Sequence, residues 1–382
     1  MNLSRLVAIN PANGNNKTTF PAACAAKAVR AALGLALLAL PPASLYAQNP
    51  FLPPPPATAT TIPSNGDVNP YGVAFVPPRF AFGGTIQPGD ILVSNFNNSQ
   101  NLQGTGTTVV SISPNGKTSL FYQGKAPLGL TAALGILRAG FVFVGNMPTT
   151  DGTSATAKAG SVLVLNSSGV LLGSFQGQST VDGPWGMAIN EVDDQVQMFL
   201  SNVLSGTVVR FDLVASRRSN TITIRDTVVI GSGFEHRPDP AALELGPSGL
   251  AYDAANDILY VADSADNTIR SISNAGALTQ DAGTGTVIYQ DNTHLHGVLD
   301  LVLAPNGHLL VANSDGSNVD PNQPSEIVEF TTGGEFVTQF SVDPNNGGAF
   351  GVNIQSVGGA TRFAAVDDNQ NTLLMSTIVP FK

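Results

Sequence analysis

The stretch Pro247–Ile272 reads PSGLAYDAANDILYVADSADNTIRSI, and the fold can be inferred from it. It contains three short apolar runs, GLAY, ILYVAD and TIRSI, separated by polar turns rich in Asp, Asn and Ala. Short β-prone runs between such turns predict a hairpin followed by a third strand. A sheet of this size needs neighbours to bury its faces, so the stretch predicts similar units elsewhere in the chain.

Similar units do recur, at spacings of 51 to 63 residues. The leading Gly-containing element is found at Gly72, Gly129, Gly186 and Gly249, with weaker copies at Asp300 and Gly351. The second strand of each copy ends in Asn or Asp, at Asn95, Asn146, Asn202, Asp263, Asn313 and Asp367. Third and fourth strands follow, except that the sixth copy ends before a fourth strand.

Six four-stranded units at this period predict an all-β fold, a six-bladed β-propeller spanning residues 67–382. A propeller must close its ring, and the sixth unit lacks its outer strand. The segment TATTI at residues 58–62 can supply it. We therefore predict that residues 48–66 form a Pro-rich spacer with a ring-closing N-terminal strand.

Residues 1–47 have the pattern of a signal peptide. Four basic residues and no acidic one are found in this segment, and an apolar run of ten covers residues 31–40. This run is too short to span a bilayer comfortably, so an uncleaved anchor fits poorly. With cleavage after Ala47, we predict an extracytoplasmic protein, either periplasmic or secreted.

Cleavage would leave 13 basic and 27 acidic residues, a net charge of −14. This charge argues against nucleic acid or anionic lipid as a partner. The single cysteine, Cys24, would leave with the signal peptide, so the mature chain has no disulfide. We expect a monomer without a membrane span in the mature chain, whose partner is a small-molecule or protein ligand.

The pattern P-x-G-[LMV]-A, turn, L-Y-V-[AS]-[DN], T-I-R-S-I resembles the NHL-repeat and related six-bladed propellers, over roughly Asn69–Val379. The resemblance implies the fold. Proteins of similar fold include sensor and scaffold domains, gluconolactonase-type lactonases, virginiamycin-type lyases and the peptide-amidating lyase. Fold alone does not choose among these activities.

Strand order assigns the loops to two faces of the propeller. Loops after each second strand and the blade-to-blade connections share one face, which we call the connection face. Hairpins after the first and third strands lie on the other, the hairpin face. Long polar loops follow the second strands of units 1, 2 and 5, and such loops are where binding usually resides.

Three of the four histidines fall in connections. His236 lies between units 3 and 4, and His294 and His296 lie between units 4 and 5. In an extended segment His-x-His places both rings on one side, where they can bind a divalent metal or relay a proton. The alternative is that they hydrogen-bond loop backbone. His308 falls on the hairpin face, where we expect it to be solvated.

The six Asn and Asp residues at strand ends can satisfy the backbone of the following turn, or a subset can bind a hard cation. Resemblance to gluconolactonase-type enzymes makes Asn202 and Asp263 the nearest ligand equivalents. Trp185, the only tryptophan, begins a first strand at the mouth of the axial funnel. There it can stack on a ligand or pack between blades.

Three functions are compatible with these patterns. The first is a module that binds a ligand or protein through the connection face. The second is a metal-dependent lyase or hydrolase that uses His236, His294 and His296. The third is a structural or assembly component. No cofactor is identified by the sequence beyond the divalent metal of the second hypothesis.

Overall fold

The computed structural model describes residues 50–52, 57–81, 83–313, 317–318, 322 and 325–378. The predicted signal peptide lies outside these residues. The described part consists mostly of β-strands and contains one 3₁₀ helix, η1 (Ser154–Thr156). No helix found there is long and apolar enough to cross a membrane.

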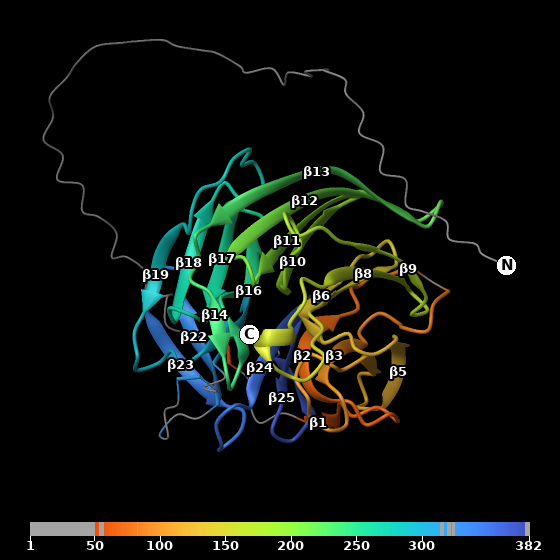
Figure 1. Cartoon of the computed structure of the whole chain (residues 1–382), viewed down its shortest axis with the longest axis horizontal. Coiled ribbons are helices and arrows are strands. Elements are labelled where there is room, and N and C mark those ends of the chain that lie inside the picture. Colours follow the sequence, from red (N-terminus) through yellow and green to blue (C-terminus); the bar gives the residue numbers. More distant parts are fainter. Residues whose placement is uncertain are drawn as a thin grey trace, which may run out of the picture. The chain divides into compact units, whose positions relative to one another are not determined.

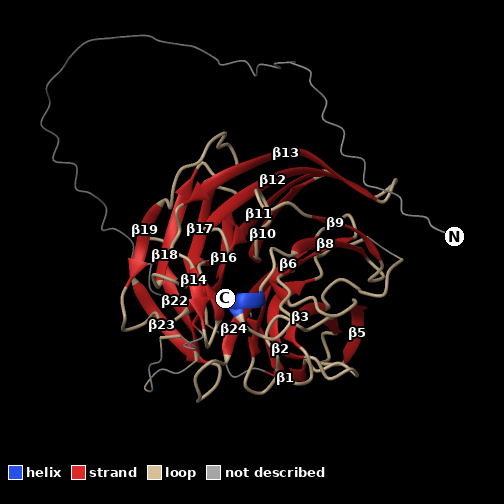
Figure 2. Ribbon diagram, viewed as in Figure 1, coloured by secondary structure: helices blue, strands red, loops and turns tan. Residues whose placement is uncertain are grey.

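The chain forms a six-bladed β-propeller of four-stranded antiparallel sheets, which follow one another around a central axis (Figure 1, Figure 2). Blade 1 contains β2 (Val68–Phe75), β3 (Ile91–Asn97), β4 (Thr108–Ile112) and β5 (Thr118–Gln123). Blade 2 contains β6 (Leu130–Ile136), β7 (Phe141–Asn146), β8 (Ser161–Asn166) and β9 (Leu171–Phe175). Blade 3 contains β10 (Pro184–Val192), β11 (Gln195–Asn202), β12 (Thr207–Ser216) and β13 (Thr221–Ser232).

The second half repeats this order. Blade 4 contains β16 (Pro247–Asp253), β17 (Ile258–Asp263), β18 (Thr268–Ser273) and β19 (Thr286–Gln290). Blade 5 contains β20 (Val298–Leu303), β21 (His308–Asn313), β22 (Glu326–Thr331) and β23 (Phe336–Ser341). Blade 6 contains β24 (Ala349–Val357), β25 (Ala360–Asp367), β26 (Thr372–Ile378) and β1 (Ala57–Thr60). A small additional hairpin, β14 (Arg237–Asp239) and β15 (Leu243–Leu245), lies between blades 3 and 4.

The outermost strand of blade 6 comes from the N-terminal part of the chain. β1 pairs antiparallel with β26, with Ala57 opposite Met375 and Thr60 opposite Thr372. It begins one residue and ends two residues earlier than the predicted segment 58–62, and beyond its end Thr61 donates its backbone N–H and hydroxyl to the Asn371 carbonyl (3.0 and 2.8 Å). That this pairing stabilises the ring stays a prediction.

The core lies between neighbouring blades. Phe199 of blade 3, for example, shares one buried cluster with Leu250 and Val261 of blade 4. Each inner sheet is covered on both faces, which explains why runs such as ILYVAD are almost continuously apolar. Burial of this apolar surface is the main stabilising contribution.

Inner strands approach one another closely around the axis. A Cβ on Gly186 would lie 2.0 Å from the carbonyl oxygen of Ser248 in the next blade. In blade 5, Asp300 takes this position, and its carboxylate accepts the Val352 N–H of blade 6 (3.0 Å). Burial raises the pKa of Asp300 to about 7. The repeated glycine is therefore required by packing, which accounts for its recurrence without invoking function.

Candidate functional site

Four aromatic side chains gather at the connection-face end of the axis. Tyr71, Trp185 and Phe350 lie near the starts of inner strands β2, β10 and β24, and Phe96 lies near the end of β3. The ring centroid of Tyr71 is 4.6 Å from that of Phe350, 5.1 Å from that of Phe96 and 5.5 Å from that of Trp185. We call these four residues the aromatic cup.

Trp185 is packed within this cup. Its ring meets Tyr71 edge-on at 88° and Phe96 at 72°, and the residue is only 1% exposed. Edge-to-face contacts of this kind stabilise aromatic clusters. Of the two sequence interpretations, the structure thus shows the packed one, and no face of the indole is open to a ligand in this conformation.

The β14–β15 hairpin, which the sequence did not reveal, covers the aromatic cup. Leu243 belongs to the same buried cluster as Trp185 and Tyr71, and it is 2% exposed. At the tip of the hairpin the Asp239 carboxylate accepts the N–H groups of Ala241 (2.8 Å) and Ala242 (3.0 Å). The hairpin therefore has a defined turn and inserts one apolar side chain at the axis.

Leu243 has an unusual backbone conformation. Its φ is +66°, and the Glu244 N–H donates to the Ala242 carbonyl (2.8 Å), which makes a γ-turn centred on Leu243. Of the ten non-glycine residues with positive φ in the described chain, eight are Asn or Asp, the types that tolerate this region. A leucine there is strained, and such strain persists only where surrounding contacts impose it.

Two loops hold the hairpin over the cup. Gln103, in the loop of blade 1, donates its side-chain amide to the Ala241 carbonyl (3.0 Å). Ser154, in η1 of the blade 2 loop, donates its hydroxyl to the Leu243 carbonyl. Thr149 of the second loop donates to the Gln103 carbonyl (2.5 Å), so the loops are also tied to each other. Figure 1 shows η1 beside β14 near the axis.

Residues 98–107, 147–160 and 237–245 therefore form one surface, which we call the crest. The sequence predicted only part of the crest. The polar loops of blades 1 and 2 were recognised, but the apolar residues of AALEL (241–245) were not assigned to a hairpin.

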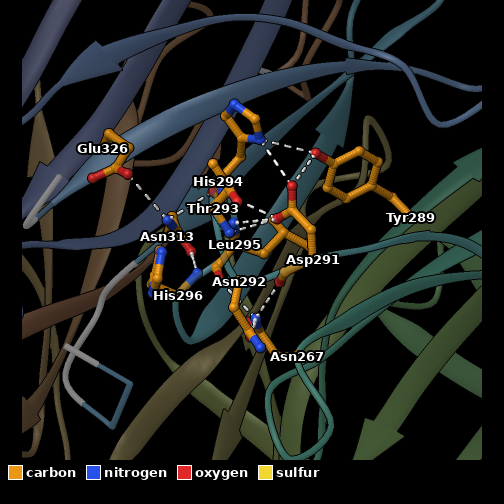
Figure 3. Close-up of polar contacts among 10 residues, drawn as sticks. All are labelled: Asn267, Tyr289, Asp291, Asn292, Thr293, His294, Leu295, His296, Asn313 and Glu326. Carbon is orange, nitrogen blue, oxygen red and sulfur yellow. Dashed lines mark hydrogen bonds and ion pairs between the residues drawn. The ribbon is translucent and has the colours of Figure 1, made fainter. Parts of the chain in front are cut away.

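His294 lies in a compact polar cluster at the blade 4–blade 5 junction. Its Nδ1 is 2.8 Å from the Asp291 carboxylate and 3.1 Å from the Tyr289 hydroxyl (Figure 3). Its ring stacks on the ring of Phe336, with 3.9 Å between the ring centroids. Burial acts to raise the pKa of Asp291, but hydrogen bonds from Tyr289 and from the His294 backbone outweigh it and hold that pKa well below its usual range.

The two rings of His-x-His do not lie side by side. The segment is a turn, in which the Asp291 carboxylate accepts the backbone N–H groups of Thr293, His294 and Leu295, so strand alternation does not apply. Nδ1 of His296 instead lies 3.2 Å from the Asn318 carbonyl, and the two rings point in different directions in Figure 3. The expectation of an extended segment was wrong.

His236 lies apart from the polar cluster of His294 and from His296. Its Nδ1 is 3.2 Å from the Phe234 carbonyl. Among the described residues, no group of three His, Cys, Asp or Glu side chains is arranged to hold a metal ion. His236, His294 and His296 thus do not form the three-ligand set that the metal hypothesis requires.

The six Asn and Asp residues at strand ends are buried and bound to backbone or to the next strand. Asn202 donates to the Thr180 carbonyl and to the Thr207 hydroxyl (both 3.1 Å), and it accepts the Asp182 N–H (3.0 Å). Asn313 similarly donates to the His294 carbonyl (3.1 Å). Asn95, Asn202 and Asn313 thus bind the connection before their blade. Asp263 and Asp367 accept N–H groups of the turn that follows, which is the structural role that the sequence predicted.

Asp263 carries a carboxylate where four of the six positions carry an amide. It is fully buried, and while Oδ1 accepts the Ala265 N–H (3.1 Å), Oδ2 has no hydrogen-bond partner among the described residues. Burial, with the nearby charge of Asp266, raises the pKa of Asp263 to about 7. Asp263 and Asp367 are therefore the two protonatable groups in a set whose other four members are amides.

The expectation that His308 is solvated was wrong. It is 5% exposed, and its Nδ1 lies 2.6 Å from the carboxylate of Glu329, which is fully buried. Glu329 also accepts the backbone N–H groups of Phe51 (2.7 Å) and Leu52 (3.1 Å). The N-terminal segment thus covers this turn of blade 5, a long-range contact that local sequence cannot reveal.

Comparison with solved structures shows the fold. A calcium-binding protein, regucalcin of Agrobacterium tumefaciens, superposes with a TM-score of 0.51 at 11% identity, covering 86% of this chain and 97% of that one. A glucose dehydrogenase superposes with a TM-score of 0.48 at 11% identity, covering 86% of this chain and 100% of that one. A luciferin-regenerating enzyme superposes with a TM-score of 0.46 at 12% identity, covering 85% of this chain and 96% of that one. No family model matches the chain, and no curated protein does.

Proposed function

We propose that this chain is an exported, NHL-like propeller that binds a protein or other ligand through its crest. One observation carries the proposal: three segments far apart in sequence are tied by side-chain hydrogen bonds into a continuous surface over the axis. A surface held in place before binding loses less conformational entropy when a partner arrives. Export is supported by the basic and then apolar pattern of residues 1–47.

The position of the crest favours binding over chemistry at the axis. Leu243 of the crest packs onto the aromatic cup, and Trp185 in that cup is 1% exposed. Leu102, by contrast, is 37% exposed on the blade 1 loop and gives the crest an apolar contact point. Apolar anchors within polar rims are common features of binding surfaces.

Photo-crosslinking tests this proposal. A benzophenone amino acid replaces Leu102 on the crest or, as a matched control, Val192, which is 60% exposed at the hairpin-face end of β10. We expect a saturable crosslink to one species in extracellular or periplasmic extract from Leu102 only. Identical crosslinking patterns from both positions would contradict binding through the crest.

A further inference from the structure

We propose that Leu243 is an internal ligand, and that the crest binds a peptide turn whose leucine-like side chain replaces Leu243 in the aromatic cup. This inference rests on the proposed function, and it specifies the partner. The hairpin would then act as a plug that such a partner displaces, while the loops of blades 1 and 2 stay held in place by the hydrogen bond from Thr149 to Gln103.

The aromatic cup is built independently of the hairpin. Its four rings come from blades 1, 3 and 6 and contact one another directly, at centroid distances of 4.6 to 5.5 Å. Leu243 is added to them from the connection between blades 3 and 4. A branched apolar side chain from another peptide would meet the same rings.

The crest also recognises peptide backbone. Gln103 donates to the Ala241 carbonyl, and Ser154 donates to the Leu243 carbonyl, two residues further along. Ala241 lies in the turn of the hairpin and Leu243 has a φ of +66°, so the two donors are spaced for the carbonyl groups of residues i and i+2 in a peptide turn. Main-chain hydrogen bonds together with a side-chain pocket give both affinity and specificity for such a peptide.

The strain at Leu243 makes displacement feasible. Its γ-turn with φ +66° is imposed by the surrounding contacts. A separate peptide is not tied into the β14–β15 hairpin, so it can place its leucine in the cup without this strain, which favours exchange. The next residue, Glu244, is 6% exposed, and burial raises the pKa of its carboxyl group.

The test uses the heptapeptide DPAALEL, the sequence of residues 239–245, and the variant Leu243→Gly, which empties the cup and relaxes the backbone. Trp185, the only tryptophan, reports binding by its fluorescence. We expect the peptide to bind Leu243→Gly about tenfold or more tightly than wild type. A peptide with Ala in place of the leucine should bind about tenfold or more weakly, since it lacks the buried side chain.

Arg79→Gly is the matched control, because Arg79 also has a positive φ (+64°) but lies in a hairpin-face turn. It should bind the peptide as wild type does. Leu243→Ala keeps a Cβ and is measured in parallel. It should also bind DPAALEL more tightly than the peptide with Ala in place of the leucine. This second variant keeps the test possible if the glycine variant fails to fold.

Equal binding of both peptides to a folded Leu243 variant, or no binding, would overturn the inference. A saturable crosslink from Leu102 alongside that result would leave the proposed function standing. Peptide binding without a crosslink from Leu102 would instead contradict the proposed function, which is binding of a partner through the crest.

Discussion

At the scale of single residues, Asp263 is the clearest departure from the repeat. Four of the six equivalent positions hold Asn, whose amide can both donate and accept, as Asn202 does. The Asp263 carboxylate is fully buried, and one of its oxygens lacks a hydrogen bond among the described residues. Ionising it in the folded state is therefore unfavourable, and its pKa is raised to about 7.

Asp263→Asn should stabilise the protein above neutral pH. The raised folded-state pKa means that wild type loses stability as pH rises from about 4 to 7, and Asn does not ionise. We expect a gain on the order of 2 kcal/mol at pH 8 and much less at pH 5, from urea unfolding at both pH values. Asn202→Asp should show the opposite change, and a gain of equal size at both pH values would contradict the explanation.

At the scale of elements, the N-terminal segment is held at two places. β1 pairs with β26 in blade 6, and the backbone of Phe51 and Leu52 binds the buried Glu329 carboxylate in blade 5. Sequence predicted the first contact from the strand that the sixth repeat lacks. It could not predict the second, because the partners are 278 residues apart and carry no repeat signal.

Deleting residues 48–60 should destabilise the propeller, because it removes both contacts and leaves β26 as an unpaired edge strand. We expect the melting temperature to fall by roughly 5 °C or more in a thermal scan. The double variant Phe51→Ala, Leu52→Ala keeps β1 and should give a smaller decrease. An unchanged melting temperature in the deletion would mean that ring closure does not depend on this segment.

At the scale of the whole molecule, several carboxyl groups are desolvated by the close packing of blades. Burial raises the pKa of Asp263, Asp300 and Asp368 to about 7, and that of Asp367 to about 6. The pKa of Asp291 is shifted in the opposite direction, so its contribution to stability changes only below pH 4. Between pH 4 and 7, Asp291 therefore does not offset the loss of stability that the raised groups cause.

The protein should unfold at a higher temperature at pH 5 than at pH 8. In this window the folded state keeps protons on these carboxyl groups that the unfolded state releases, so stability falls as pH rises. Thermal scans at half-unit intervals, at constant ionic strength, measure this slope. A melting temperature that rises steadily from pH 5 to pH 8 would show that these groups are not desolvated as described.

The six repeats, their strands, the repeated glycine and the recurring Asn and Asp residues can be recognised from the sequence. Those features depend on local periodicity and turn chemistry, which recur in each repeat. The insertion of Leu243 into the aromatic cup, the packing of Trp185 and the burial of His308 could not be predicted in this way. Each depends on contacts between distant segments, such as Ser154 with Leu243, 89 residues apart, and no local pattern encodes such a meeting.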